Sequence, residues 1–465
     1  MNSEFKIFDA IIVGSGQGGN PLALALAKAG WKVALVEREH VGGTCINTGC
    51  TPTKTMVASA RIAHLVNRAQ DYGIESVKGN VNLSKVLKRK NEVVKSFREG
   101  SRNNLTSTPG ISLIEGNARF IGKKELEIEL SNGEKTKIKA DKIIIDTGSR
   151  PSKPPIPGLE NVYFFDSTSI MEIEKIPEHL IIIGGGYVGL EFGQMFHRFG
   201  SKVTIIQRND QLLPLEDKDV AEEIAEILKQ EGLQIILGGN TSKIDLPAND
   251  KIVLTVRKDE IDQTFEGSHL LVATGRSPNT SFLNPHATGI TLDKKGFIPV
   301  NDQLETSVPG IFAIGDVKGG PAFTHVSYDD HKIILKNILE GGNANISGRI
   351  LPYVVYIDPQ LGRIGMNEKQ AKEQNYDYLV AKIPMSWVAR AIETDETKGL
   401  MKAIIDSKTK QILGAAILGI EGGELMSAIQ IAMLGQLPYT ALRDGMFAHP
   451  TLSESFNTLF GSIEK

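Results

Sequence analysis

The start of the chain alternates apolar runs with short polar breaks in a way that predicts a strand, a helix and a second strand. Phe8 to Val13 is a continuous apolar run of the kind found in buried strands, and it ends in a glycine-rich turn. A helix-forming stretch, Leu22 to Lys28, and a second apolar run, Lys32 to Val36, follow with short connections. This order of elements is typical of a βαβ unit in a parallel sheet.

The same order of elements is predicted a second time farther along the chain. His179 to Ile183 has the composition of a buried strand, and a glycine-rich turn and a helical stretch, Leu190 to Phe199, follow it. Lys202 to Ile206 is the next apolar strand. An internal duplication of this kind predicts an α/β protein with two dinucleotide-binding units.

The remaining stretches differ from this pattern. Residues 55 to 105 have helix-like spacing of Val and Leu among Lys, and residues 111 to 146 switch to short strands with a hairpin at 131–133. A proline cluster at 151–157 is typical of an interdomain connection. From about residue 350 the sequence predicts a third domain of the α+β class, with strands at 354–357, 399–406 and 412–420 and helices at 421–436 and 440–446.

Composition and charge narrow the class of protein. The chain has 465 residues, 41% hydrophobic and 23% charged, which is typical of globular proteins and leaves room for about three domains. The formal net charge is −3 with no basic block, which argues against a nucleic acid or an anionic membrane as partner. No apolar run approaches the ~18 residues of a membrane span, and residues 1–8 lack a signal-peptide pattern. We therefore expect a soluble, cytoplasmic protein.

The first glycine-rich turn contains a G-x-G-x-x-G motif formed by Gly14, Gly16 and Gly19. Such a motif gives a tight turn, lets the backbone approach a pyrophosphate and allows close packing of helix on strand. Here it follows a strand, opens a helix and is followed by Glu37 at the end of the next strand, where an acid suits a ribose diol. The combination predicts nucleotide binding.

The second motif, formed by Gly184, Gly186 and Gly189, differs from the first at the end of the next strand. Gln207 and Arg208 occupy the position at which an acid would favour NAD. A neutral residue followed by a cation removes the repulsion of a 2′-phosphate and offers it a positive charge, so the pattern favours NADPH over NADH. The alternative is that Arg208 is an ordinary solvated surface residue.

Both cysteines of the chain, Cys45 and Cys50, lie within one six-residue stretch just after the first nucleotide motif. Two thiols alone make a poor metal site and no disulfide framework, so we predict no metal site and interpret the pair as a redox couple. With four residues between them, the thiols are expected to meet within one helical turn. One thiolate could then contact a flavin while the other attacks a substrate.

Several ordered motifs make the chain similar to the pyridine nucleotide-disulfide oxidoreductases, the family of glutathione reductase, dihydrolipoamide dehydrogenase and mercuric reductase. Gly42 to Lys54 resembles the redox-active cysteine signature of that family, and Gly310 to Asp316 resembles its second FAD motif. Thr147 to Pro151 and Ala273 to Asn279 are similar to its domain-crossing segments, and His449 to Glu454 to its His–Glu dyad. The resemblance covers essentially the whole chain.

The resemblance implies two Rossmann-like domains, for FAD and NAD(P), and a C-terminal α+β dimerisation domain. The expected boundaries are 1–150 with 276–348 for FAD, 151–275 for NAD(P) and 349–465 for dimerisation. The family's activity implies that electrons pass from NAD(P)H through FAD to a redox-active disulfide, Cys45–Cys50, and on to a small oxidised substrate.

The same resemblance assigns roles to individual residues. Cys50 would be the flavin-contacting thiol and Cys45 the thiol that exchanges with substrate. Lys54, paired with Glu191, would stabilise negative charge on the reduced flavin. Tyr187 would cover the nicotinamide face of the flavin until the nucleotide displaces it.

A dyad near the C-terminus completes the implied active site. His449, oriented by Glu454, would act as acid–base for the substrate thiol and keep Cys45 reactive. In the family this histidine reaches the active site of the other subunit, so a homodimer is implied. The implied cofactor contacts are Gly14, Gly16, Gly19, Glu37, Thr44, Lys54, Ala118, Gly148, Asp316 and Thr324 for FAD, and Gly184, Gly186, Tyr187, Gly189, Arg208 and Gly275 for NAD(P).

Softer motifs, at 323–330, 437–444 and 452–460, are similar to bacterial reactive-chlorine-resistance flavoreductases that reduce hypothiocyanous acid, and to mercuric-reductase-like proteins without metal-relay cysteines. The substrate would then be an oxidised thiol or a hypothiocyanous-acid-type oxidant. No cysteine follows Cys50, which makes mercury a doubtful substrate and argues against thioredoxin reductases with a C-terminal redox tail.

Alternative functions remain open at this point. A dihydrolipoamide dehydrogenase would fit the His–Glu dyad but would usually carry an acid in place of Gln207. A mercuric or cupric ion reductase is a further alternative, and a flavin-bound redox sensor or scaffold would need none of the catalytic residues. The substrate pocket is not predicted, since Trp387, Arg390 and Ile392 to Thr397 could line it or lie on the surface.

Overall fold

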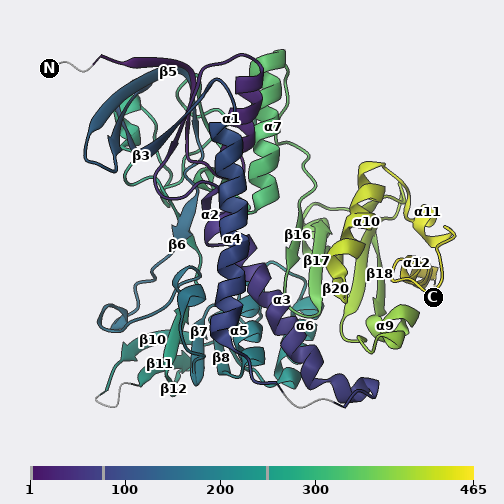
Figure 1. The fold of residues 1–465 in the computed structure, drawn as a ribbon. Coiled ribbons are helices and arrows are strands. Elements are labelled where there is room, and N and C mark those ends of the chain that lie inside the picture. The colour runs from purple at the N-terminus through teal and green to yellow at the C-terminus, as the bar shows by residue number, and fades with distance from the viewer. Residues whose placement is uncertain (1–3, 76–78, 248–250, 465) are drawn as a thin grey trace. The chain divides into compact units, whose positions relative to one another are not determined.

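The computed structural model describes residues 4–75, 79–247 and 251–464, and its elements are labelled in Figure 1. By their internal packing the residues form two compact units. Unit 1 comprises residues 1–56, 84–152 and 275–349, and unit 2 comprises residues 57–83, 153–274 and 350–465. Each unit contains one glycine-rich turn of the duplicated pattern.

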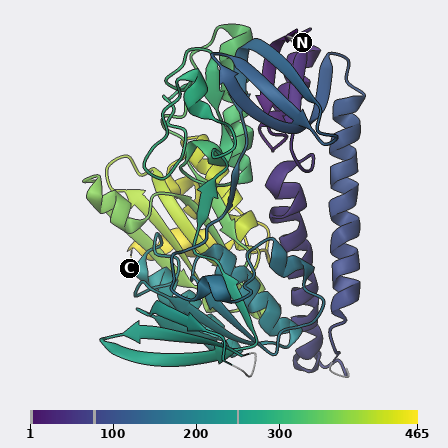
Figure 2. The same ribbon diagram turned by 90° about the vertical axis from the view of Figure 1, so that its left-hand side faces the viewer.

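Unit 1 is built on a six-stranded sheet, seen at the purple and blue end of the chain in Figure 2. Strands β1, β2, β3, β5 and β15 form a parallel array, and β4 joins β3 and β5 in antiparallel fashion. A small sheet pairs β6 with β14. The bounds are Lys6–Val13 (β1), Val33–Glu37 (β2), Ile111–Gly122 (β3), Glu125–Leu130 (β4), Lys135–Ile145 (β5), Ser149–Pro151 (β6), Arg276–Pro278 (β14) and Ile311–Ala313 (β15).

The central strand of unit 1 is buried on both faces, which explains its unbroken apolar run. On one face Ala10 and Ile12 pack with residues of α1 (Gly19–Lys28) and α7 (Thr324–Glu340), which lie side by side in Figure 1. On the other face Ile11 and Val13 pack against the β3–β5 region. The two faces alternate residue by residue, as strand geometry requires. The other helices that begin in this part of the chain are α2 (Gly43–Asn47), α3 (Cys50–Asn67) and α4 (Leu83–Thr106).

Unit 2 contains a four-stranded parallel sheet in the order β13-β7-β8-β9 and an antiparallel sheet in the order β10-β11-β12. Helix α5 packs on β7 and β8. The bounds are His179–Ile183 (β7), Tyr187–Phe199 (α5), Lys202–Gln207 (β8), Lys218–Glu231 (α6), Gln234–Leu237 (β9), Asn240–Asp245 (β10), Ile252–Lys258 (β11), Ile261–Gly267 (β12) and His269–Val272 (β13).

The C-terminal part of unit 2 forms its own antiparallel five-stranded sheet, β16-β17-β20-β19-β18, with its own apolar core. Helix α10 packs across β17 and β20. The bounds are Pro352–Val355 (β16), Gln360–Gly365 (β17), Glu368–Glu373 (α8), Tyr378–Pro384 (β18), Ala389–Glu393 (α9), Leu400–Asp406 (β19), Ile412–Gly419 (β20), Gly422–Leu434 (α10), Tyr439–Arg443 (α11) and Ser455–Gly461 (α12). Turns of 3-10 helix lie at Ala69–Tyr72 (η1), Leu159–Asn161 (η2), Ser169–Glu172 (η3), Pro285–Thr288 (η4), Gly315–Lys318 (η5), Met385–Trp387 (η6) and Ser462–Glu464 (η7).

The mixed α/β class and both predicted βαβ units are confirmed, with differences at element ends. Helix α1 begins at Gly19, within the glycine motif and ahead of the predicted Leu22, because the motif itself supplies the first helical turn. The helical region predicted for 55–105 is two helices, α3 and α4, with the η1 turn between them. Among the described residues no helix is long and apolar enough to cross a membrane.

Candidate active site

The first glycine-rich turn of unit 1 has the geometry that the motif predicts. Gly14 has φ +107°, and a Cβ there would lie 2.2 Å from the carbonyl oxygen of Asp146. Gly14 donates its N–H to the Val36 carbonyl oxygen at 2.8 Å, which ties the turn to the neighbouring strand β2. Helix α1 follows with no side-chain cap and no acidic residue in its first turn. The positive end of this helix is therefore suited to a phosphate group.

Polar atoms near this turn fit a bound nucleotide. Among the described residues, the buried Asn20 Oδ1 and Thr147 Oγ1 have no hydrogen-bond partner. Glu37 at the end of β2 is held by the N–H and Oγ of Ser15, which donate to Glu37 Oε2 at 2.9 and 2.7 Å. A fixed carboxylate at this position can accept hydrogen bonds from a ribose diol. The residues of unit 1 therefore fit the FAD that the family resemblance implies.

Two segments far apart in sequence meet beside this turn. Ser149 Oγ donates a hydrogen bond of 2.6 Å to Asp316 Oδ2, so the segment after β5 lies against η5. Arg276 holds the same serine through Ser149 Oγ and the Ser149 carbonyl oxygen, both at 2.7 Å. Gly148 (φ +64°) has an open side, because a Cβ there would contact no atom within 4 Å. The structure thus brings predicted FAD contacts Gly148 and Asp316 into one region of unit 1.

Other predicted FAD contacts have different environments. Thr44 lies exposed in α2, and Gly16 approaches Gly43, whose Cβ would lie 2.9 Å from the Gly16 Cα. Ala118 is paired with Ile128 within the β3–β4 hairpin, and its methyl group is buried in the apolar core. Only the backbone of Ala118 is left for a ligand.

The two cysteines meet, but not within one helical turn as the sequence analysis expects. Cys45 lies in α2, Cys50 is the first residue of α3, and Thr48 and Gly49 interrupt the two helices. Gly49 lets the chain fold back, since a Cβ there would lie 2.9 Å from the Thr44 carbonyl oxygen. Both cysteines are free thiols in the structure. Cys45 is partly buried, whereas Cys50 is exposed.

The electrostatics of the pair distinguish the two sulfur atoms. The hydrogen bond with Cys50 raises the pKa of Cys45, and burial and the negative charge of Cys50 raise it further; Thr324 and Lys54 oppose this shift. Cys50 Sγ lies 3.4 Å from Thr324 Oγ1 at the start of α7. The proton is therefore held on Cys45, while Cys50 lies at the start of α3 and beside the start of α7.

The second glycine-rich turn, in unit 2, repeats the backbone of the first with different polar groups. Gly184 has φ +115° and donates its N–H to the Ile206 carbonyl oxygen at 2.9 Å. Gln207, only 7% exposed, accepts a hydrogen bond from the Gly185 N–H at 3.2 Å and donates to the Gln211 carbonyl oxygen at 3.3 Å. Its amide therefore supports the turn from within. Arg208 follows it and is exposed.

The remaining NAD(P) contacts predicted from the sequence lie around this turn or farther along the chain. A Cβ at Gly186 would contact no atom within 4 Å, which leaves this side of the turn open. Gly189 allows helix α5 to pack closely against the turn, since a Cβ at this position would lie 2.0 Å from the Gly184 carbonyl oxygen. Tyr187 is the first residue of α5 and is half-buried. Gly275, with φ +124°, is the first residue of the 275–349 segment of unit 1.

The predicted dyad forms in the C-terminal part of unit 2. His449 Nδ1 lies 2.9 Å from Glu454 Oε2 and 3.0 Å from Glu454 Oε1. The side chain of His449 is 70% exposed, and that of Glu454 is 22% exposed. With its Nδ1–H donated to the carboxylate, the imidazole is left with Nε2 free to exchange a proton.

Glu191 and Lys54 lie in different units. Glu191 is buried in α5, and its Oε1 accepts a hydrogen bond of 2.9 Å from the Tyr356 N–H. Lys54 lies in the first turns of α3 and is half-buried. Their pairing stays a prediction.

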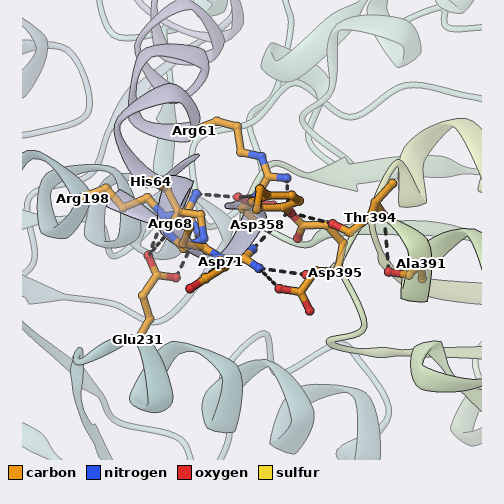
Figure 3. Close-up of polar contacts among 12 residues, drawn as sticks. Arg61, His64, Arg68, Asp71, Arg198, Glu231, Asp358, Ala391, Thr394 and Asp395 are labelled. Atoms are coloured by element: carbon orange, nitrogen blue, oxygen red, sulfur yellow. Dashed lines mark hydrogen bonds and ion pairs between the residues drawn. The ribbon is translucent and has the colours of Figure 1, made fainter. Parts of the chain in front are cut away.

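Figure 3 shows a network in unit 2 that the sequence analysis missed, in which arginines of α3 and α5 meet carboxylates from three segments. Arg198, whose side chain is 6% exposed, bonds to Glu231 and to Asp358, both at 2.5 Å. Arg61 of α3 reaches the same Asp358 at 2.6 Å and Glu396 at 2.5 Å. The network therefore fastens the C-terminal half of α3 to its neighbours.

Burial and neighbouring charges set the pKa values of the titratable groups in this network. The pKa of Asp358 is lowered because Arg198 and Arg61 outweigh the effect of burial, and the pKa of Glu231 is lowered mainly by Arg198. His64 lies among these groups, and burial together with the charge of Arg198 lowers its pKa to about 4. No local sequence signal marks this cluster, because its members come from five separate segments.

The network also assigns a role to part of the segment for which the sequence left two alternatives. Arg68 bonds to Asp395 at 2.5 Å and to Glu396 at 3.3 Å, and Tyr72 donates to the Thr394 carbonyl oxygen at 2.7 Å. Residues 394–396 thus anchor α3 and its following turn. Trp387, in contrast, is 61% exposed. Among the described residues no group of three or more His, Cys, Asp or Glu side chains could hold a metal ion.

Comparisons with known proteins agree with this geometry. The family model of the pyridine nucleotide-disulphide oxidoreductases matches residues 8–330, and the family model of their dimerisation domain matches residues 351–460. The chain is 39% identical over 461 residues to the probable pyridine nucleotide-disulfide oxidoreductase RclA of Escherichia coli strain K12, covering 98% of this chain and 99% of that protein. It is 34% identical to a mercuric reductase of Bacillus cereus, covering 98% of this chain and 72% of that protein. It is 35% identical to a dihydrolipoyl dehydrogenase of Thermus scotoductus, covering 99% of this chain and 98% of that protein.

Solved structures give the same result. A Cu(II) complex of the HOCl-induced flavoprotein disulfide reductase RclA from Escherichia coli has a TM-score of 0.89 at 38% identity, covering 98% of this chain and 99% of that chain. A second structure of the HOCl-induced flavoprotein disulfide reductase RclA from Escherichia coli has a TM-score of 0.88 at 38% identity, covering 97% of this chain and 99% of that chain. The resemblance to reactive-chlorine-resistance flavoreductases is confirmed, and the family implies FAD and NAD(P)H as cofactors. The chain belongs to the pyridine nucleotide-disulphide oxidoreductase family.

Proposed function

We propose that this oxidoreductase uses NADPH to reduce a hypothiocyanous-acid-type oxidant through the Cys45–Cys50 pair. The observation that carries the proposal is the pair itself: two thiols in hydrogen-bond contact, in the same compact unit as the first glycine-rich turn. FAD, when bound, would supply the two-electron redox chemistry that links NADPH to the cysteines. Because cytoplasmic conditions keep thiols reduced between turnovers, we place the reaction there.

The balance of the reaction fixes what the cysteines must do. Two electrons and two protons convert the Cys45–Cys50 disulfide to the dithiol. The dithiol and one hypothiocyanous acid then give back the disulfide, with thiocyanate, water and one proton as the other products. Cys45 retains its proton beside Cys50, so an acid–base group must remove that proton before Cys45 can attack.

His449 is our candidate for this proton transfer. Its Nδ1 is held by Glu454 and its imidazole is largely exposed in the single chain. We infer that a second subunit supplies the cysteine pair on which this histidine acts, in keeping with the dimerisation domain matched at residues 351–460. Lys54 with Glu191 would stabilise negative charge on the reduced flavin, and Tyr187 would leave the nicotinamide face of the flavin when NADPH binds.

The preference for NADPH rests on the second turn. The buried Gln207 brings no negative charge to the strand end, and the exposed Arg208 beside it is available to a 2′-phosphate. A guanidinium group suits phosphate because it donates two parallel hydrogen bonds.

The test is anaerobic oxidation of NADPH by the purified enzyme, with hypothiocyanous acid and lipoamide compared side by side. We expect fast turnover of the first and little of the second. The reverse result, with a preference for NAD, would make the enzyme a dihydrolipoamide dehydrogenase. Turnover of neither, with fast reduction of mercuric or cupric ion, would make it a metal-ion reductase like the mercuric reductases to which it is similar.

The Cys45→Ser variant tests the mechanism separately from the substrate. It should still bind FAD and allow NADPH to reduce the flavin, but turnover should fall at least about 1000-fold. The control variant is Ser59→Ala, which lies farther along α3 and outside the cysteine pair. Full turnover by Cys45→Ser would rule out the cysteine mechanism for every substrate.

Mixed dimers test the sharing of active sites. A Cys45→Ser subunit and a His449→Ala subunit, each inactive as a homodimer, should together restore about a quarter to a half of the activity if each site uses residues of both chains. Mixtures without recovered activity, in which subunit exchange is verified by mass, would mean that the dyad acts within its own chain.

A further inference from the structure

Beneath the first glycine-rich turn lies a buried carboxyl group to which no role has been given so far. Asp146 follows directly on β5 and is only 7% exposed. Its Oδ2 accepts a hydrogen bond of 2.8 Å from the N–H of Gly19, the first residue of α1. A Cβ at Gly16 would lie 2.6 Å from the same oxygen atom. The carboxyl group therefore fills the space under the turn.

The other carboxyl oxygen faces a third and a fourth segment. Asp146 Oδ1 lies 3.5 Å from Ser327 Oγ of α7, and a Cβ at Gly315 would lie 2.9 Å from this oxygen. One side chain thus touches the glycine turn, the start of α1, α7 and the turn that leads to Asp316. These are the parts of unit 1 in which the FAD contacts were predicted.

The second turn of the same chain shows what the fold does without such a group. Asp146 donates its backbone N–H to the Val13 carbonyl oxygen at 2.8 Å, and Ala273 does the same to Ile183 at 2.8 Å. The two residues therefore occupy equivalent positions, and both are followed by Thr and Gly. A Cβ at Gly186, the equivalent of Gly16, would contact nothing within 4 Å. The turn does not require a carboxyl group in order to form.

We propose that Asp146 is a positioning residue for FAD, which in its neutral, protonated form braces the first glycine-rich turn against α1 and α7. The inference rests on FAD binding at this turn, as argued above. A neutral group meets a geometric need here without adding a negative charge beneath the pyrophosphate, which is itself anionic. The Gly19 N–H, which would otherwise be buried without a partner, is satisfied by Oδ2.

The charges around Asp146 favour this protonated form. Burial raises the pKa of Asp146 well above its usual value, and the carboxylates of Asp316, Asp330 and Glu37 raise it further, whereas the Gly19 hydrogen bond lowers it. Asp330, on α7, is itself paired with Lys318 at 3.4 Å and with Arg349 at 2.7 Å. The cations in this region are therefore engaged by another carboxylate.

Release of FAD from the purified holoenzyme tests the inference, followed by recovery of flavin fluorescence after dilution. Asp146→Ala, which copies the residue at position 273, should release FAD at least about 10-fold faster than the wild type. Asp146→Asn keeps the shape and an acceptor for Gly19 and should stay within about twofold at pH 7. Asp141→Ala, an exposed carboxyl on the same strand, is the matched control and should leave release unchanged.

The pH profile separates the neutral form from shape alone. Across a pH series, release from the wild type should accelerate once the pH is high enough to ionise Asp146, because a charged Asp146 repels the pyrophosphate, whereas release from Asp146→Asn should not. Equal release by Asp146→Ala and the wild type would overturn the bracing role, and identical pH profiles for Asp146→Asn and the wild type would overturn the neutral form. If Asp146→Ala does not fold, FAD titration of the Asp146→Asn apoprotein decides, since an affinity more than about 10-fold below that of the wild type would overturn the proposal. A wild-type protein that binds no FAD would instead refute the proposed function.

Discussion

The two glycine-rich turns of this chain share one backbone and differ in the polar side chains around it. In both, the first glycine has a positive φ and donates to the adjacent strand, and its Cβ position is blocked by a carbonyl oxygen of the strand on the other side. The first turn carries Glu37 and Asp146 where the second carries Gln207 and Ala273, and Ser15 where the second carries Gly185.

This difference indicates that the backbone of the turn is generic and that its polar groups select the ligand. In both turns the backbone N–H of the residue after the first glycine donates to the side chain at the end of the next strand, Glu37 or Gln207, and the Ser15 hydroxyl group adds a second hydrogen bond to Glu37. A carboxylate thus stands at the end of β2, whereas a neutral amide followed by the exposed Arg208 stands at the end of β8. The following predictions test this comparison, beginning with the largest effect.

Replacing the first glycine of either turn with alanine should impair the binding of one cofactor only, which is FAD for Gly14 and NADPH for Gly184. A Cβ at Gly14 or Gly184 would lie 2.2 or 2.4 Å from a backbone oxygen, and the positive φ adds strain, together about 3 kcal/mol or more. We expect Gly14→Ala to purify with less than about a tenth of the FAD of the wild type. Gly184→Ala should keep its FAD and raise the KM for NADPH about 100-fold.

Gly30→Ala is the control for this pair, because Gly30 also has a positive φ but its Cβ would contact no atom within 4 Å. It should lower the Tm without affecting either cofactor. Retention of full FAD by Gly14→Ala would show that the first turn is not the FAD site.

Acid should weaken unit 2 through the network at the end of α5. His64 has a pKa of about 4 in the folded protein, whereas its ordinary value is 6.5. As the pH falls from 6.5 to about 4, the imidazole of His64 takes up a proton in the unfolded chain but not in the folded chain. The free energy of unfolding therefore decreases as the pH falls through this range. The loss is about 1–3 kcal/mol.

Thermal unfolding between pH 7 and pH 4 measures this effect. The decline in Tm should be shallower for His64→Gln than for the wild type, while the exposed His40→Gln should follow the wild type. An unchanged slope in His64→Gln would mean that the imidazole is protonated within the network, despite Arg198.

Removal of the guanidinium group beside the second turn should weaken NADPH selectively. We expect Arg208→Ala to raise the KM for NADPH about 10-fold, equivalent to about 1.4 kcal/mol, with little change for NADH. Arg257→Ala, an exposed arginine on β11 of the same unit, is the control for general loss of positive charge. Equal effects on both nucleotides would make Arg208 an ordinary surface residue.

The smallest effect is expected from the hydroxyl group that distinguishes Ser15 from Gly185. Ser15→Ala loses the 2.7 Å bond to Glu37 but keeps the backbone donor. Titration of the apoprotein should show FAD affinity lowered about fivefold, equivalent to about 1 kcal/mol, with the KM for NADPH unchanged. An effect of the same size on NADPH would show that the two turns are coupled.

Much of the candidate site could be predicted from sequence, because it consists of short contiguous motifs. The glycine turns, Glu37, the cysteine pair and the His449–Glu454 dyad each lie within a few residues or within one βαβ unit, where local backbone rules decide geometry. The placement of the cysteines on one helical turn was wrong, since Gly49 permits a fold-back between two helices that a spacing rule does not capture.

By itself, the sequence determined the α/β class, the duplicated turns, the redox pair and the family, because periodicity and glycine spacing are local properties of the chain. Only the tertiary structure decided that Asp146 lies beneath the first turn and that Arg61, Arg198 and Asp358 form one buried network. Burial and the approach of separate segments set the charge state and the partners of these groups. Neither is encoded in the residues next to them.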